Sequence, residues 1–270
     1  MRKAVNDWAF RRFWPLERWM AEAREAGFTA VECNAGPEPE SYLKPGMTGG
    51  ELDAVRRSAD EAGVEIASLS TAQLNEWRLT SGSRDERAKS ENLIRFMIEA
   101  AHRLGARTVL VVPGMVTPDT GYDEAYARAM DSLRRLAAEA SAAGVVIGVE
   151  NVPGNRFLLS PLEFRRFIDE ADSPALRVYL DIGNVLPLGF PEQWIRLMAG
   201  RLAAVQAKDM REGAGALPLL AGDVNWPAVA AALKETGFAG TVTATPPAFL
   251  HYPRQVMRDT ASQLAAILVE

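Results

Sequence analysis

The sequence contains little that could crosslink the chain or bind a soft metal. Among its 270 residues there is one cysteine, Cys33, so no internal disulfide can form. The two histidines, His102 and His251, are too few to build a Cys/His metal site with it. Any metal that the chain binds must therefore be held mainly by oxygen atoms.

Long apolar runs and an excess of basic charge are also missing. No stretch approaches the roughly 20 apolar residues that span a bilayer. The N-terminal segment carries basic charge but no apolar run. A formal net charge of −5 and a pI near 5.3 argue against electrostatic binding to nucleic acid or to an anionic membrane. We therefore expect a cytoplasmic protein whose partner is a small molecule.

Short apolar or β-branched runs alternate with longer segments of helical spacing, which is typical of repeated βα units. Residues 87–104, for example, place Leu93, Met97 and Leu104 on one face of an expected helix. The predicted strands cover residues 3–7, 29–33, 64–69, 107–112, 145–150, 177–181, 202–206 and 240–245. With 48% hydrophobic residues, the chain suits an α/β fold, a single (β/α)8 TIM barrel over residues 1–270.

One joint between helix and strand recurs along the chain. Five segments each lead from an expected helix through a glycine into an expected strand: AREAGFTAVE, ADEAGVEIAS, AHRLGARTVL, ASAAGVVIGV and LKETGFAGTV. Glycine just past a helix end supplies the left-handed conformation that closes the helix. Segments 36–50, 113–121 and 213–222 are richer in Pro and Gly and follow strands two, four and seven. We expect them to be long loops at the catalytic end of the barrel.

Carboxylates close two neighbouring strands. The fifth strand ends in GVEN, with Glu150 and Asn151, and the sixth ends in YLDIGN, with Asp181 and Asn184. Because the catalytic groups of such barrels lie at the carboxyl ends of strands, these side chains are expected at the mouth. They suit an oxygen site for Mg²⁺ or Mn²⁺, or a pair for proton transfer. Hydrogen-bonded strand ends without a function are the alternative.

Five segments carry a family resemblance. In chain order they are IGVENVPGNRFLLSP, VYLDIGNVLPLGFPEQWI, VQAKD, LAGDVNWPAVAAAL and FAGTVTATPP. They resemble the xylose-isomerase-like barrel family of sugar phosphate isomerases and epimerases, which includes L-ribulose-5-phosphate and ketose 3-epimerases. The likeness covers nearly the whole chain from AGFTAVE onward. It implies the barrel fold but no single substrate, because one such scaffold hosts many reactions.

The resemblance implies four metal-ligand positions, and two of them differ here. Similar proteins bind a divalent metal through a glutamate closing strand five, an aspartate closing strand six, a histidine in an H-x-K-D stretch on strand seven and a glutamate closing strand eight. Glu150 and Asp181 match the first two, whereas Gln206 replaces the histidine and Thr245 the last glutamate. Asn184 stands where a histidine often follows the aspartate. We expect binding of Mn²⁺ or Mg²⁺ at Glu150, Asp181 and Gln206 to be weak or absent.

The same two replacements affect the expected chemistry. In related epimerases, two glutamates are thought to exchange protons with one carbon from opposite sides of the substrate. Thr245 cannot act as a base at neutral pH without an activating partner, so this two-base route is not expected. Glu150 remains the expected base, with Asp181 as its orienter or as a residual metal ligand.

Further side chains are candidates for the site. Glu32 closes strand two and would serve either as a replacement acid or base or as a structural ion-pair member. His251 lies in the loop after strand eight, at the end of the barrel expected for catalysis, and histidine is a common general acid or base. Candidates for substrate binding are Trp8, Trp77, Asn151, Phe157, Asn184 and Lys208. A local salt bridge is the alternative role for Lys208.

Three functions are compatible with these residues. The first is a sugar or sugar phosphate isomerase or epimerase that moves a proton next to a carbonyl group through Glu150. The second is a metal-independent lyase, dehydratase or isomerase of specialised metabolism that uses Glu150, Glu32 and His251. The third is a non-catalytic binding protein on the same barrel. The resemblance also allows a homodimer.

Overall fold

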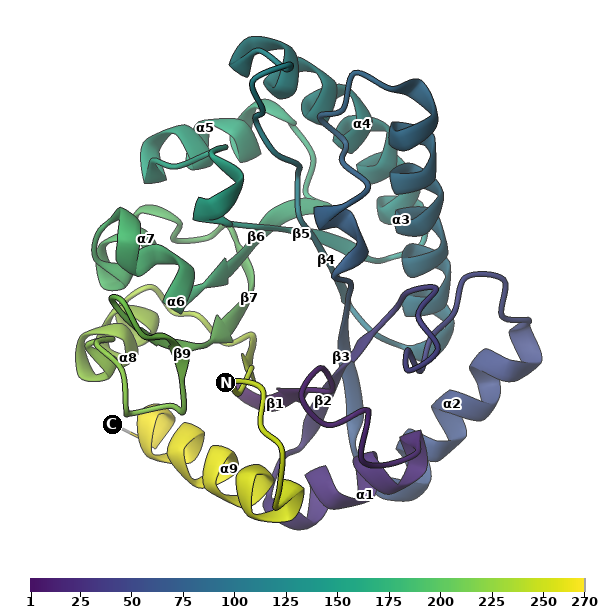
Figure 1. Ribbon diagram of the computed structural model, residues 1–270, viewed down its shortest axis with the longest axis vertical. Helices are drawn as coiled ribbons and strands as arrows, with labels where there is room; N and C mark the ends of the chain where they lie inside the picture. The colour runs from purple at the N-terminus through teal and green to yellow at the C-terminus, as the bar shows by residue number, and fades with distance from the viewer. Residues whose placement is uncertain (270) are drawn as a thin grey trace.

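The computed structural model describes residues 1–269 of the chain. Eight parallel strands form a closed barrel in the order β1-β10-β7-β6-β5-β4-β3-β2, which confirms the predicted (β/α)8 fold (Figure 1). The strands are β1 (Arg2–Asn6), β2 (Ala30–Asn34), β3 (Glu65–Ser70), β4 (Thr108–Val111), β5 (Val146–Glu150), β6 (Leu176–Asp181), β7 (Leu202–Ala207) and β10 (Thr241–Ala244). Each agrees with a predicted run to within one residue at both ends.

Helices surround the barrel and follow its strands in chain order (Figure 1). The outer helices are α1 (Leu16–Ala26), α2 (Gly49–Ala62), α3 (Arg84–Leu104), α4 (Tyr122–Ala142), α5 (Pro161–Glu170), α7 (Pro191–Leu197), α8 (Trp226–Glu235) and α9 (Pro253–Val269). Short turns are η1 (Gln73–Asn75), η2 (Pro153–Asn155), α6 (Ile182–Val185) and η3 (Leu186–Leu188). The ring closes where α9 lies beside α1 and β10 pairs with β1.

The helix ends have the local structure that the sequence predicts. The glycines of the five recurring joints all have positive φ, between 67° and 103°. At Gly27 the backbone N–H donates to carbonyl groups of the last turn of α1, which completes the cap. At the start of α2, Thr48 and Glu51 form a reciprocal capping box. These caps fix where each helix stops, and therefore where the next strand enters the barrel.

The segment after β7 differs from the expected loop. Residues Asp209–Arg211 (β8) and Gly215–Leu217 (β9) form an antiparallel hairpin. The buried Asp209 carboxylate anchors it by accepting hydrogen bonds from Trp226 Nε1 at 2.9 Å and from the Gly222 N–H at 3.1 Å. A Cβ atom at position 222 would lie 2.1 Å from Asp209 Oδ1, so the close approach requires glycine. One buried carboxylate thus holds the hairpin next to the strand tips.

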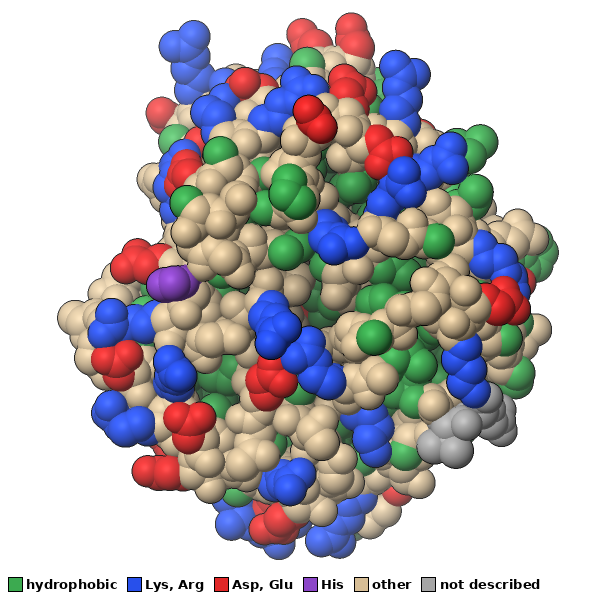
Figure 2. All heavy atoms as spheres, turned by 180° about the vertical axis from the view of Figure 1, so that it is seen from behind, with side chains coloured by type: hydrophobic (Ala, Val, Ile, Leu, Met, Phe, Trp, Pro, Cys, Tyr) green, Lys and Arg blue, Asp and Glu red, His purple; other side chains and the backbone are tan. Residues whose placement is uncertain are grey.

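The outer surface is mixed in charge. On the face shown in Figure 2, Lys and Arg side chains are interspersed with Asp and Glu side chains, and neither sign forms a large continuous area. This distribution agrees with the modest net charge of −5. None of the helices within residues 1–269 is both long enough and apolar enough to cross a membrane.

Candidate active site

A cavity of about 200 Å³ lies at the carboxyl ends of the barrel strands. Four of the side chains that the sequence predicts for the mouth line it, namely Glu150, Asp181, Gln206 and Thr245. Lys208 and Trp8 line it as well. The parallel register brings residues far apart in sequence to the same end of the barrel, because strand tips of a closed parallel sheet meet there.

Asp181 and Lys208 form an ion pair at the floor of the cavity. Lys208 Nζ lies 2.7 Å from Asp181 Oδ2, although no donor in the described chain makes a well-angled hydrogen bond to that oxygen. The ammonium also donates to Asn184 Oδ1 at 2.7 Å. Burial opposes the charged form of Lys208, yet the carboxylates of Asp181 and Glu150 raise its pKa above the usual value. Lys208 is therefore a charged ammonium at neutral pH.

Two asparagines hold the carboxylates in place. Asn151 exchanges two hydrogen bonds with the backbone of Asp181, at 2.8 and 3.0 Å. The Asn184 backbone N–H donates to Asp181 Oδ1 at 3.0 Å, which caps the short helix α6. The Asn184 side-chain amide donates to Glu150 Oε1 at 3.2 Å. Asn184 thus connects both carboxylates with the ammonium of Lys208, while the buried Asn151 supports the site from behind.

Glu150 faces the cavity from the end of β5. Burial raises its pKa well above the usual value, the nearby Asp181 charge raises it further, and Lys208 opposes the shift. A carboxylate with a raised pKa is a stronger base than one in water, because the proton it takes is held more tightly. The side chain is half-buried, so its carboxylate remains within reach of a molecule in the cavity.

The two neutral replacements contact each other. Gln206 Nε2 donates to Thr245 Oγ1 at 2.7 Å, across the neighbouring strands β7 and β10. The amide N–H of Gln206 and the hydroxyl of Thr245 therefore satisfy one another. Neither side chain brings a negative charge or an imidazole to the cavity.

These side chains differ from the ligand set that a divalent metal favours. A hard cation such as Mn²⁺ or Mg²⁺ takes about six oxygen ligands and favours uncompensated carboxylates. Here the two carboxylates share a nearby ammonium, since Lys208 Nζ already contacts Asp181. Across residues 1–269, His, Cys, Asp and Glu side chains do not gather in any group of three or more that could hold a metal ion.

Glu32 lies deeper than the sequence predicts. Strand β2 continues two residues beyond Glu32, to Asn34. Glu32 pairs in the sheet with Asn6 and Ser68, and its side chain is fully buried inside the barrel. Its carboxylate accepts hydrogen bonds from Asn6 Nδ2 and Ser68 Oγ, both at 2.6 Å, and from the Tyr179 hydroxyl at 2.5 Å. The expectation that Glu32 reaches the mouth is corrected: it supports the cavity from within the barrel.

This network gives a stability prediction. Replacing Glu32 with alanine removes the shared acceptor of three buried donors, of which Asn6 and Tyr179 keep only their contacts with Ser70 and Thr243. We expect the free energy of unfolding to fall by about 3 kcal/mol. Urea denaturation followed by circular dichroism measures the change. Glu65→Ala is the control: its carboxylate pairs with Arg2 on a partly exposed surface, so it should cost less than about 1 kcal/mol. Equal losses in the two variants would contradict the structural role of Glu32.

Sequence reasoning missed several polar residues of the cavity wall. Asn6, Asn34 and Ser70 line it, and Asn34 donates to Asn6 Oδ1 at 3.1 Å. Asp7, just beyond β1, accepts from the Asn34 backbone N–H at 2.9 Å. Burial raises the pKa of Asp7 to about 6, against the opposing effect of its hydrogen bonds with Asn34. Polar residues at the ends of strands one to three were the available signal.

The remaining candidates lie in different places. Trp8 lines the cavity; its backbone N–H donates to Asn6 Oδ1 at 2.7 Å, and the Arg11 guanidinium lies 4.6 Å from its ring centroid. Phe157 is buried against Phe167 in the outer layer, and Trp77 packs partly buried against the core. His251 is exposed in the loop after β10. None of these last three side chains lines the cavity, although His251 does lie in the loop where the sequence places it.

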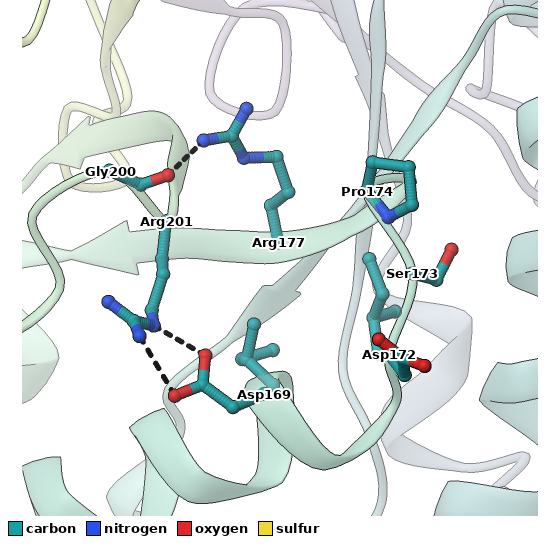
Figure 3. A pocket seen from close by; sticks show the side chains of 9 residues that line it. Asp169, Asp172, Ser173, Pro174, Arg177, Gly200 and Arg201 are labelled. Atoms are coloured by element: carbon teal, nitrogen blue, oxygen red, sulfur yellow. Dashed lines mark hydrogen bonds and ion pairs between the residues drawn. The ribbon is translucent and has the colours of Figure 1, made fainter.

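A second hollow, of about 390 Å³, lies at the opposite end of the strands. It is formed where β6 and β7 begin, and Figure 3 shows Arg201 bridging to Asp169 beside it. The two Arg201 hydrogen bonds to the Asp169 carboxylate measure 2.5 and 2.9 Å, and Arg177 donates to the Gly200 carbonyl. Polar groups at this end of a barrel serve stability, so we place the candidate site at the other end.

Comparison with known proteins agrees with this architecture. The family described as xylose isomerase-like TIM barrel matches residues 20–265. A 2-epi-5-epi-valiolone 7-phosphate 2-epimerase from Actinoplanes sp. is 30% identical over 200 residues, which are 73% of this chain and 69% of that protein. A putative L-ribulose-5-phosphate 3-epimerase of Escherichia coli is 27% identical over 76% of this chain and 71% of its own length.

Solved structures share the fold at lower identity. A D-tagatose 3-epimerase-like protein superposes with a TM-score of 0.84 and 21% identity, covering 100% of this chain and 97% of that one. A D-psicose 3-epimerase from Clostridium cellulolyticum, solved with D-tagatose, has a TM-score of 0.83 and 16% identity, covering 99% of both chains. At this identity the likeness concerns the barrel and not the substrate.

Proposed function

Since the chain belongs to the xylose isomerase-like TIM barrel family, we propose that it is an epimerase or isomerase acting on a sugar or sugar phosphate. Its curated relatives are named as epimerases of phosphorylated polyhydroxy compounds. One observation carries the proposal: Glu150, with its raised pKa, faces a small polar cavity beside the Lys208–Asp181 ion pair. That arrangement supports removal of a proton from carbon next to a carbonyl group.

In the proposed reaction, the substrate binds with its acidic C–H bond toward Glu150. Glu150 takes the proton, and the electron pair of the C–H bond moves onto the carbonyl oxygen to give an enediolate. Return of the proton to the same carbon or to its neighbour completes the reaction without any oxidant. Asn184 holds Glu150 in position, and Trp8 offers an aromatic face to the sugar ring.

The opposite wall of the cavity favours isomerisation over inversion. Thr245, the residue just after β10, lies across the cavity from Glu150 on β5, with β6 and β7 between the two strands. Its hydroxyl is hydrogen-bonded to Gln206 and has no basic partner in that contact. With a base on one face only, a proton removed from one carbon returns most readily to the same face of the substrate. An aldose–ketose shift is then the simplest outcome.

Exchange of a carbon-bound proton with deuterated water tests the proposal. The protein should be incubated with L-ribulose 5-phosphate, D-allulose, D-tagatose and D-fructose, and each solution followed by proton NMR. We expect loss of one C–H signal next to the carbonyl for at least one compound. Product analysis then distinguishes an epimer from an aldose. Release of water or a fragment would favour a dehydratase or lyase, and binding without exchange would favour a binding protein.

The pH dependence of this exchange follows from Glu150. The base must be ionised to act, and its pKa in the folded protein is raised. Activity should therefore keep rising with pH through the neutral range, whereas a carboxylate of ordinary pKa would be fully ionised by about pH 6. Initial exchange rates between pH 5 and pH 9 test this, at a saturating concentration of the identified substrate. A rate that is level above about pH 6 would show that Glu150 is not the base.

A further inference from the structure

We propose, building on the function above, that the Lys208 ammonium is the permanent cation of this site and holds the substrate's carbonyl oxygen during proton transfer. The family resemblance implies a divalent ion beside the carboxylates that close strands five and six. In this chain the ammonium of Lys208 contacts one of those carboxylates, Asp181, at 2.7 Å. The protein would thus supply from its own side chain the positive charge that similar proteins take from a metal.

The position of the ammonium supports this role. Lys208 Nζ contacts Asp181 Oδ2 and Asn184 Oδ1, each at 2.7 Å, and Asn184 in turn binds Glu150. The cation therefore lies among the groups that hold both carboxylates. Among the described residues that line the cavity, Lys208 is the one that carries a positive charge. The H-x-K-D stretch of similar metal-binding proteins also has a lysine at this point, so the difference in this chain is that Gln206 and Thr245 replace the histidine and the last glutamate beside it.

The backbone is shaped to accommodate the lysine. A Cβ atom on Gly183 would lie 2.9 Å from the Lys208 carbonyl oxygen and 3.1 Å from Lys208 Cε. Any larger residue at position 183 would push against both the backbone and the stem of the lysine. The absence of a side chain at Gly183 thus leaves room for Lys208 to lie over α6 and extend toward Asp181.

A divalent ion would compete with this ammonium for the same oxygen. An ion bound to Asp181 would stand at about 2.0–2.6 Å from its carboxylate. The ammonium, 2.7 Å from Oδ2, would then be pressed against a like charge. Without the histidine and the glutamate that closes strand eight in similar proteins, little remains to offset that repulsion. Conversely, the ammonium can donate a hydrogen bond to the oxygen that becomes negative as Glu150 removes the proton.

Lys208→Met tests the inference, because methionine keeps the length of the side chain and removes its charge. Mn²⁺ binding is measured by titration calorimetry without any sugar. We expect the unmodified protein to bind Mn²⁺ weakly and Lys208→Met to bind it at least tenfold more tightly. Lys208→Arg keeps the charge and should bind as weakly as the unmodified protein. Lys234→Met, on the exposed side of α8, is the matched control and should change nothing.

Tight Mn²⁺ binding by the unmodified protein, or equal affinities in Lys208→Met and Lys208→Arg, would overturn the inference. Circular dichroism establishes that each variant is folded, and Lys208→Gln replaces Lys208→Met if the latter is not. The second measurement is the rate of proton exchange after EDTA treatment. The unmodified protein should keep its exchange rate, whereas the rate of Lys208→Met should be at least tenfold lower. Loss of exchange from the unmodified protein on EDTA treatment would also overturn it. The Mn²⁺ titration contains no sugar, so its result does not depend on the proposed function. Failure of the proposed function would instead appear as an absence of proton exchange with every compound tested.

Discussion

Glu150→Gln is expected to lower the rate of proton exchange by about 100-fold or more, the usual loss when a general base is removed. Glutamine preserves the shape of the side chain and its hydrogen bond with Asn184, but it cannot accept a proton from carbon. The loss should appear in kcat, with little change in KM, because the substrate's other contacts remain. Exchange rates by proton NMR at several substrate concentrations separate the two constants.

The same variant should fold at least as stably as the unmodified protein at pH 8. A carboxyl group whose pKa is raised on folding holds its proton more tightly in the folded state, so it contributes stability at low pH that is lost as pH rises. Glutamine has no proton to lose in this range, so the variant should not lose stability as the pH rises. Glu235→Gln is the matched control, since Glu235 is exposed on α8 and pairs with Arg196. Unchanged exchange in Glu150→Gln, or a fall in stability with specific activity retained, would identify Glu150 as a structural carboxylate.

Gln206→His combined with Thr245→Glu should turn a weak site into a binding site for Mn²⁺. Both positions line the cavity, and the change adds an imidazole and a carboxylate next to Glu150 and Asp181. Loss of a single outer contact typically costs 10- to 100-fold in metal affinity, so restoring two direct ligands should strengthen binding by about 100-fold or more. Titration calorimetry of the double variant against the unmodified protein measures the difference.

Each single variant serves as an internal control for the double variant. Gln206→His alone and Thr245→Glu alone should bind Mn²⁺ with intermediate affinity, because each supplies one of the two missing ligands. Adding Lys208→Met to the pair should strengthen binding further. If the double variant binds no better than the unmodified protein, the strand tips do not converge as metal ligands must. Tight binding before any change would show that Gln206 and Thr245 already suffice.

The barrel was predictable because its signal is repeated. Each strand is a short apolar run between helical segments, and the joint glycines mark where helices stop, so errors at one strand do not spread to the next. The residues that close β5 and β6 were predicted for the same reason, since Glu150 and Asp181 are the last residues of their strands. The Gln206 and Thr245 replacements followed from the resemblance, not from any pattern of spacing.

Depth within the barrel was not predictable. Glu32 was expected at the mouth because the predicted second strand stops one residue before the observed one. The alternation of polar and apolar residues along a strand does not show how deep in the barrel a side chain lies. Irregular pairing between β2 and β3 near Glu32 adds to the difficulty. The β8–β9 hairpin was missed because its strands have three residues each and depend on the Asp209 carboxylate, whose partners lie 13 and 17 residues further along the chain. Such contacts leave no local periodicity.

The pairing of β1 with β10 has a consequence for how the site forms during synthesis. Among the barrel strands, β1 is synthesised before β10, its partner, so the barrel cannot close until β10 has been made. Until residues 241–245 emerge, β1 and β7 are unpaired edges, and edges of this kind are prone to join other chains. Asn6 and Gln206, at the tips of those edges, would meet the wall that carries Thr245 only in the final step. The part of the cavity wall that Thr245 forms is therefore expected to be completed only when the barrel closes.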